Sequence, residues 1–321
     1  MNARFHIPDF FIHAHLNLHL IDKMKEHPEY FYDGVEIASC YGCFAPALWN
    51  GGRAVAGTST PTLINDTIRA FNERGVPIRY TFTNPTLTEN DLRDPFCNKL
   101  CRMAENGFNE IIVNLPFLEE YIREKYPMYP LVSSTVKQIE DYDALMCELE
   151  KDYKLVVLDY NWNNDFERLE KIPREYRARC EILIDPYCTP HCKRRGAHYK
   201  ALGAAQRESA EAPLTAKLRG TNTMQKAMDF KCENMGYNFY QIQQFSTFVG
   251  PEQIKKYLEM GFNNFKLEGR VLSPYNVLES YMYYMVKPEY RDICRLEILN
   301  TPNRDLLAEG QPLVREPDHT V

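Results

Sequence analysis

Two cysteines lie close together in the sequence, directly behind a predicted buried strand. Cys188 and Cys192 are separated by three residues, and they follow the apolar run at 181–185. Cys232 precedes another strand-like run, at 238–245. Thiolates are soft ligands that select zinc, copper(I) or iron–sulfur clusters, and softness alone does not choose among these metals. The spacing therefore predicts a thiolate-bound metal centre, with two unrelated loop cysteines as the alternative.

Other cysteines are candidates to complete such a centre, but most are expected to pack in the core. Cys40 and Cys43 follow the first predicted strand, so either is a candidate fourth ligand. Cys180 precedes Cys188 by a whole strand, and at ~3.3 Å per residue it would lie at the opposite end of that strand. Free cysteine packs as a small hydrophobe, and we expect this role for Cys97, Cys101, Cys147 and Cys294.

A run of charged residues ends the last predicted strand. Lys266, Glu268 and Arg270 alternate with Leu267 and Gly269, and side chains two residues apart in a strand share one face. A buried Lys–Glu pair is expensive unless both charges have partners. Near a ligand, such a pair suits anion binding or proton transfer. The alternative is a solvated strand end.

Polar and basic side chains also follow the ends of other predicted strands. Arg53, behind Gly51-Gly52, is suited to bidentate recognition of a carboxylate or phosphate. His191 and His198 are candidates for acid–base chemistry or metal ligation. Each residue also has an ordinary explanation as a cap, a turn or a solvated loop residue, but together they predict a polar substrate site. The remaining substrate-binding candidates are Asn84, Asn114, Ser134, Asn161 and Arg194.

Short apolar runs alternate with helix-like stretches along the chain, which is typical of a parallel barrel or a doubly wound sheet. Eight predicted strands, without a Gly-x-Gly-x-x-Gly turn, favour a (β/α)8 TIM-type barrel, closed or incompletely closed, with its active site at the carboxyl ends of the strands. One barrel domain is predicted over 1–300, with an insertion of loop or short helices around 193–230 over this end and a tail at 301–321. The predicted strands are 34–39, 76–83, 110–113, 131–135, 154–159, 181–185, 238–245 and 264–268, and the clearest predicted helices are 61–74, 91–106 and 251–260.

Composition limits the class of protein. Of the 321 residues, 44% are hydrophobic and 26% are charged, an ordinary globular balance. The net charge of −6 argues against a general polyanion binder, so nucleic acid is a disfavoured partner. No stretch approaches the roughly 20 apolar residues that span a bilayer, and no signal core follows the N-terminal residues. We therefore expect a cytoplasmic protein without a membrane partner, whose 10 cysteines are reduced thiols rather than disulfides.

The charged run carries a resemblance to a known family. Lys266 to Arg270, followed by Ser273-Pro274, is similar to the Lys-Ile-Glu-Gly-Arg…Ser-Pro signature of the collagenase-like peptidases, the peptidase U-32 family. The segment 121–127, ahead of 133–135, is similar to the middle region of that family. The resemblance extends over about residues 34–285.

This resemblance implies a barrel-type catalytic domain. Several relatives are oxygen-independent hydroxylases with a [4Fe–4S] cluster that act on ubiquinone precursors or RNA bases, some with prephenate as the oxygen source. Cys188, Cys192 and Cys232 fall where such members place cluster-binding cysteines. The usual Gly-Arg-Cys stretch of the family is replaced here at 190–195. Paired family members also suggest a paralogous protein partner.

These observations lead to one expectation and two alternatives. The expected protein is an iron–sulfur-dependent, hydroxylase-like enzyme that modifies a small molecule or nucleobase, with zinc or another thiolate-bound metal as the alternative cofactor. Lys266, Glu268, Arg270 and Arg53 are expected to bind an acidic substrate or co-substrate. The alternatives are a metal-assisted peptidase and a non-catalytic, cluster-binding partner subunit.

Overall fold

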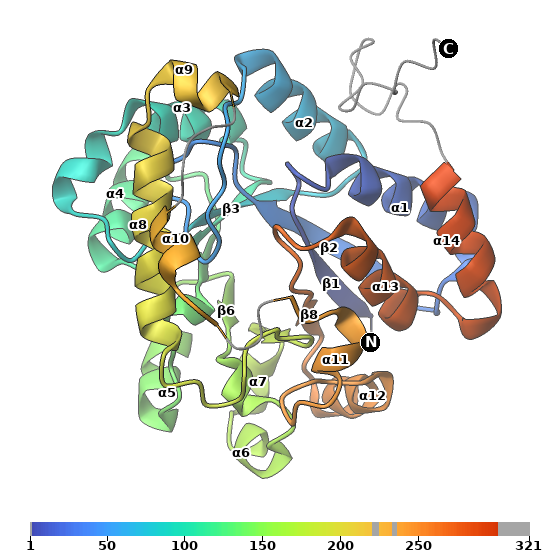
Figure 1. Cartoon of the computed structure of the whole chain (residues 1–321). Helices are drawn as coiled ribbons and strands as arrows, with labels where there is room; N and C mark the ends of the chain where they lie inside the picture. Colours follow the sequence, from blue (N-terminus) through green and yellow to red (C-terminus); the bar gives the residue numbers. More distant parts are fainter. Residues whose placement is uncertain (1, 220–224, 233–235, 301–321) are drawn as a thin grey trace, which may run out of the picture.

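Eight parallel strands form a closed barrel in chain order, from β1 to β8. A computed structural model describes residues 2–219, 225–232 and 236–300 (Figure 1). The barrel closes where β1 pairs with β8, so the predicted TIM-type (β/α)8 barrel is confirmed. The strands are β1 (Ala3–Pro8), β2 (Val35–Gly42), β3 (Ile78–Phe82), β4 (Glu110–Val113), β5 (Leu131–Ser133), β6 (Leu155–Val157), β7 (Cys180–Leu183) and β8 (Asn264–Lys266).

Helices connect the strands and surround the barrel (Figure 1). Local capping chemistry sets their ends: Thr60 accepts a hydrogen bond from the Leu63 amide at the start of α2, and Gly261 ends α12 with a φ of 101°, as glycine commonly does. None of the helices in the described ranges is long and apolar enough to cross a membrane. The helices are α1 (Ala14–Glu26), α2 (Pro61–Glu73), α3 (Pro95–Ala104), α4 (Pro116–Lys125), α5 (Tyr142–Leu149), α6 (Phe166–Glu170), α7 (Arg174–Arg177), α8 (Arg195–Glu211), α9 (Leu214–Arg219), α10 (Gln225–Asp229), α11 (Phe239–Ile242), α12 (Pro251–Met260), α13 (Pro274–Met285) and α14 (Arg291–Asn300).

Two strand predictions were wrong. One strand was missed and one helical segment was predicted as a strand, so the predicted number of strands is still eight. The first strand is β1, which the sequence did not reveal because Arg4 and His6 interrupt its short apolar pattern. The segment at 238–245 was predicted as a strand but contains the helix α11. Asn238 accepts hydrogen bonds from the amides of Tyr240 and Gln241, and this N-cap favours the helix over a strand.

The segment around 193–230 also differs in part from its prediction as a loop or short helices. Within its described part lies the 17-residue helix α8, which runs along one side of the molecule (Figure 1). The predicted tail at 301–321 lies outside the described residues. The hydrophobic core packs mainly between the barrel and its helices, while a smaller apolar cluster is formed by Tyr41, Ile112, Val132, Leu155 and Val157.

Candidate functional site

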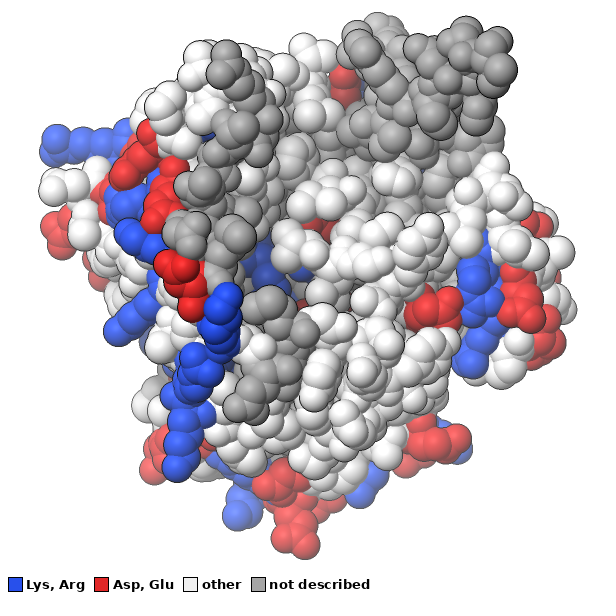
Figure 2. All heavy atoms as spheres, viewed as in Figure 1, with Lys and Arg blue, Asp and Glu red and all other residues white. Residues whose placement is uncertain are grey.

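A cavity lies at the carboxyl ends of the strands, where barrels of this type place their active sites. Its volume is about 130 Å³. Figure 2 shows Lys and Arg atoms recessed near the middle of the molecule. The predicted site residues that line the cavity are Arg53, Ser134, Cys188, His198, Cys232, Lys266, Glu268 and Arg270. Its walls also include aromatic side chains that the sequence did not single out, namely Tyr41, Tyr160, Tyr187 and Tyr199.

Lys266 and Arg270 bring two buried cations to this cavity. The Lys266 ammonium lies 3.3 Å from Glu181 Oε1 and 4.2 Å from the centre of the Tyr41 ring. Arg270 donates hydrogen bonds to Asn50 Oδ1 at 2.9 Å, Thr81 Oγ1 at 2.8 Å and the Gly51 carbonyl at 2.5 Å. These three acceptors are all neutral, so none of them balances the guanidinium charge of Arg270.

An ion pair and two hydrogen bonds fix the position of Glu268. Its carboxylate forms an ion pair with Arg53, and it accepts a hydrogen bond from the Tyr187 amide at 3.0 Å. Its own amide donates to Asp185 Oδ1 at 2.6 Å. Burial raises the pKa of the Asp185 carboxyl well above its usual range. The Arg53–Glu268 pair therefore forms a fixed, charge-balanced edge of the cavity.

Helix α8 adds a second balanced pair that sequence reasoning missed. Arg195 contacts both carboxylate oxygens of Asp159, and its guanidinium lies 4.4 Å from the centre of the Tyr160 ring. The Arg195 side chain is only 3% exposed. In the sequence, Arg195 lies next to Arg194 in a basic run. The sequence alone does not show which of these two side chains points into the cavity.

Three thiols lie at or beside the cavity. Cys188 lines it, and both the Tyr160 hydroxyl and the Cys192 thiol are within hydrogen-bonding reach of the Cys188 sulfur. Burial raises the pKa of the Cys188 thiol. Cys232 lines the same cavity from the chain beyond α10. Among the residues described, no three Cys, His, Asp or Glu side chains are grouped to hold a single metal ion.

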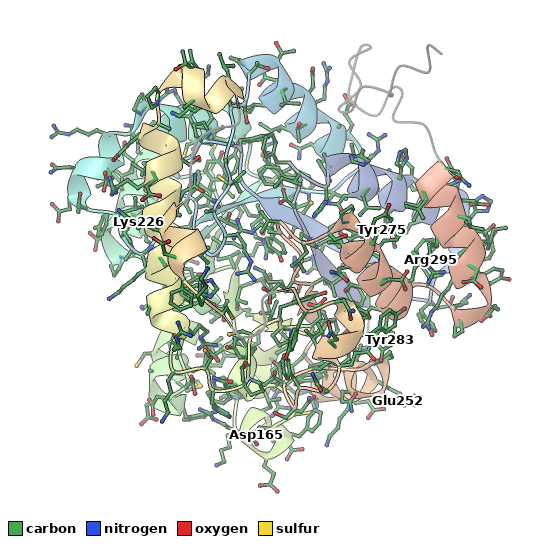
Figure 3. All side chains as sticks on the ribbon, in the orientation of Figure 1. Asp165, Lys226, Glu252, Tyr275, Tyr283 and Arg295 are labelled. Carbon is green, nitrogen blue, oxygen red and sulfur yellow. The ribbon has the colours of Figure 1, made fainter. Side chains whose placement is uncertain are left out.

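The segment that carries Cys232 is held against α8. Lys226 of α10 lies 3.6 Å from the Glu208 carboxylate of α8 (Figure 3). Phe230, two residues before Cys232, stacks on His198 of α8. These contacts explain how a cysteine 44 residues after Cys188 in the sequence reaches the same cavity.

A family model named Peptidase family U32 matches residues 50–292 of this chain. The chain belongs to peptidase family U32. Members of this family are generally enzymes, and the matched segment includes the cavity residues from Gly52 to Arg270. A solved structure described as the U32 peptidase Mk0906 shares 13% sequence identity, with a TM-score of 0.47, and covers 84% of this chain and 93% of its own. No curated protein matches the chain.

Two predicted ligands of the U32 chain lie in its hydrophobic core instead of lining the cavity. Cys40 is fully buried and accepts a hydrogen bond from Asn17 Nδ2 at 3.3 Å. Cys43 is also buried, and burial raises the pKa of its thiol far above the usual range. Their positions do not support the prediction that either one supplies a fourth thiolate, because neither lines the cavity that Cys188 and Cys232 share.

Several other predicted residues also fall outside the cavity lining. Asn84 instead bridges the Leu48 and Gly203 carbonyls, at 2.9 and 3.2 Å, and so joins α8 to the rim of the barrel. Asn161 donates to Glu140 and accepts from the amide of His191, whose own side chain is 73% exposed. The others are Asn114, which is half-buried, Arg194, which is exposed, and Cys192, which contacts Cys188 beside the cavity.

Proposed function

We propose that this U32 protein is an iron–sulfur-dependent, oxygen-independent hydroxylase-like enzyme that modifies a small acidic molecule or a nucleobase. One observation carries the proposal: Cys188 and Cys232 line the same small cavity as the cations Lys266 and Arg270. A thiolate-bound cluster beside an anion site is an arrangement suited to redox chemistry on a bound acid.

Two observations support a cluster: thiolates are its usual ligands, and two of the three thiols line one cavity. Cys188, Cys192 and Cys232 would hold it, and a four-iron cluster spreads its ligands over more space than a single ion does. Three protein thiolates leave one iron without a protein ligand. When bound, the cluster would supply an electron donor or acceptor and a Lewis acid next to the substrate. Zinc held by the same thiols is the alternative occupant.

The cations around the cavity support an acidic substrate or co-substrate. Arg53 is paired with Glu268 and Arg195 with Asp159, so these charges are already balanced. Arg270 donates to neutral oxygens only, among the described residues. A carboxylate or phosphate bound at Arg270 would gain charge-assisted hydrogen bonds from a guanidinium that is largely buried.

The name of the family favours a second candidate, a metal-assisted peptidase. Cys188 and His198 line the same cavity, and thiolate and imidazole are both ligands of hydrolytic zinc. A non-catalytic partner subunit, paired with a paralogous protein, is the third reading. In that case the cluster would be structural.

The test is anaerobic purification followed by iron, sulfide and zinc analysis and an absorbance spectrum. We expect a brown protein with iron and sulfide, and Cys188→Ala, Cys192→Ala and Cys232→Ala should each lose most of the iron. Cys147→Ala is the matched control, because Cys147 is exposed and does not pack in the core as the sequence predicted. This variant should leave the iron content unchanged. An iron-free protein under these conditions would refute the cluster. Peptide hydrolysis that persists in Cys192→Ala and Cys232→Ala but stops in Cys188→Ala would favour the peptidase.

A further inference from the structure

A column of ionisable side chains runs through the interior of the barrel below the cavity. Arg79 of β3 is fully buried, and it pairs with Glu110 of β4 and with Glu181 of β7, each at 2.5 Å. Glu110 also pairs with Lys154, which is 42% exposed. The column therefore leads from Lys154, which is partly exposed to solvent, to the carboxylate of Glu181 inside the barrel.

Lys266 stands at the top of this column and is its only member, within the described residues, that also lines the cavity. Apart from its ion pair with Lys266, Glu181 Oε1 has no hydrogen-bond partner among the described residues. The other oxygen, Oε2, is held by Arg79 at 2.5 Å and lies 3.4 Å from His6 Nε2. The free oxygen of a rigidly held carboxylate is thus directed at a lysine amine that faces the cavity.

We propose that Lys266 is the proton donor to the bound ligand and that Glu181, held by Arg79 and His6, is the residue that positions the Lys266 amine. The inference rests on the proposed function, since it assigns a role in the same cavity. In the step, an N–H bond of the Lys266 ammonium breaks as an O–H bond forms on an anionic oxygen of the ligand. The neutral amine then recovers a proton from solvent.

The charges around Lys266 are arranged to keep this proton transferable. Burial lowers the pKa of the Lys266 amine to about 8, while Glu181 opposes that shift and Arg79 and Arg270 add to it. The Tyr41 ring covers another side of the amine. At neutral pH the amine is therefore mainly protonated, yet it gives up its proton far more readily than an exposed lysine does.

His6 helps to hold the Glu181 carboxylate in position without adding charge. Burial lowers the pKa of the His6 imidazole to about 4, so His6 is neutral at pH 7. Its Nδ1 atom lies 2.7 Å from Ser39 Oγ and 3.0 Å from Arg79 Nη2. Its Nε2 atom lies 3.1 Å from Asn264 Oδ1. The carboxylate of Glu181 is thus held in position by the neutral His6 and the cationic Arg79.

The experiment is competitive labelling of lysines with acetic anhydride over a range of pH, read out residue by residue by mass spectrometry. It uses the full chain without any cluster, so the result does not depend on whether the protein binds an iron–sulfur cluster. We expect the labelling of Lys266 to reach half its maximum near pH 8, roughly two pH units below exposed lysines in the same sample. The proposal would be overturned if the Lys266 midpoint equalled that of exposed lysines. This comparison is made within the unchanged protein and needs no variant.

Two matched variants then test the positioning role. Glu181→Gln and Glu110→Gln both remove one buried carboxylate partner of Arg79, but only Glu181 contacts Lys266. Since Glu181 favours the charged amine, Glu181→Gln should lower the Lys266 midpoint further, and Glu110→Gln should change it much less. Equal shifts in the two variants would show that Glu181 has no specific role.

Discussion

The ring of Phe230 stacks on the imidazole of His198, with ring centroids 4.6 Å apart and ring planes 3° apart. The Arg194 guanidinium also lies 4.6 Å from the centre of the Phe230 ring. Arg194 is the N-cap residue of α8 and His198 lies in the first turn of this helix, while Phe230 lies two residues before Cys232. This relationship between an aromatic ring and a helix fixes where the Cys232 thiol stands.

Removing this ring should release Cys232. In metal-free protein, Phe230→Ala should speed the alkylation of Cys232 by iodoacetamide roughly two- to tenfold, which corresponds to the ~0.5–1.5 kcal/mol of a stacked aromatic pair. Peptide mass spectrometry gives the rate for Cys232. Phe108→Ala is the control, because Phe108 is already 40% exposed and should leave the rate unchanged. An unchanged rate in Phe230→Ala would show that the stack does not hold the thiol.

Two glycines in α8 should respond oppositely to alanine. A Cβ atom at Gly203 would lie 2.2 Å from Asn84 Oδ1 and 3.1 Å from Pro85 and Thr86. Gly203→Ala should therefore lower the free energy of unfolding in urea by about 1–3 kcal/mol. The nearest atom to a Cβ at Gly196 is a Gln138 side-chain nitrogen at 3.4 Å. Gly196→Ala should thus be neutral or stabilise by up to about 1 kcal/mol, because alanine favours a helix. Equal effects would contradict the close approach of α8 to the rim.

The buried column predicts a large cost for losing its central cation. Arg79→Met should lower the free energy of unfolding by about 3–5 kcal/mol, because it leaves the buried carboxylates of Glu110 and Glu181 uncompensated. Arg69→Met removes an arginine that is 46% exposed and paired with Asp66, and should cost at most about 1 kcal/mol. Urea denaturation followed by circular dichroism measures both. Similar losses of unfolding free energy in the two variants would mean that the interior ion pairs contribute little to stability.

The contact between Arg207 of α8 and Asp91 of the 3-10 turn η2 (Glu89–Arg93) should depend on pH. The hydrogen bond from Arg207 is the main reason that the pKa of Asp91 falls from 3.8 to about 2, while burial opposes the shift. A carboxylate with a lowered pKa in the folded state stabilises the fold above the unfolded pKa, and this contribution disappears as the pH falls toward 2.

The matching variant is Arg207→Gln. At pH 7 it should lose about 1 kcal/mol of unfolding free energy relative to the unchanged protein, and this difference should shrink as the pH falls from about 4 to about 2. Lys200→Gln, on an exposed part of the same helix, is the control and should show no such pH dependence. A difference that stays constant over this range would rule out the Asp91 linkage.

Part of the candidate site could be predicted from spacing. Lys266 and Glu268 both line the cavity, as predicted from their spacing, although β8 ends at Lys266 and Glu268 lies beyond it. The strand-end residues were harder, because the side chain of a loop residue can turn either way. Asn84 turns toward α8 and His191 toward solvent, and nothing local in the sequence distinguishes them from Ser134, which lines the cavity.

The sequence by itself determined the alternation of strands and helices, and it determined which charged and sulfur-bearing side chains follow the strand ends. Tertiary structure decided the rest. Closure of the barrel by β1 places His6 beside Glu181, and it joins Arg79 to a carboxylate 102 residues away. Charged residues in otherwise apolar strands were visible in the sequence, but their partners were not. Pairing across a barrel depends on strand register and closure, which are set by packing of the whole chain rather than by any local pattern.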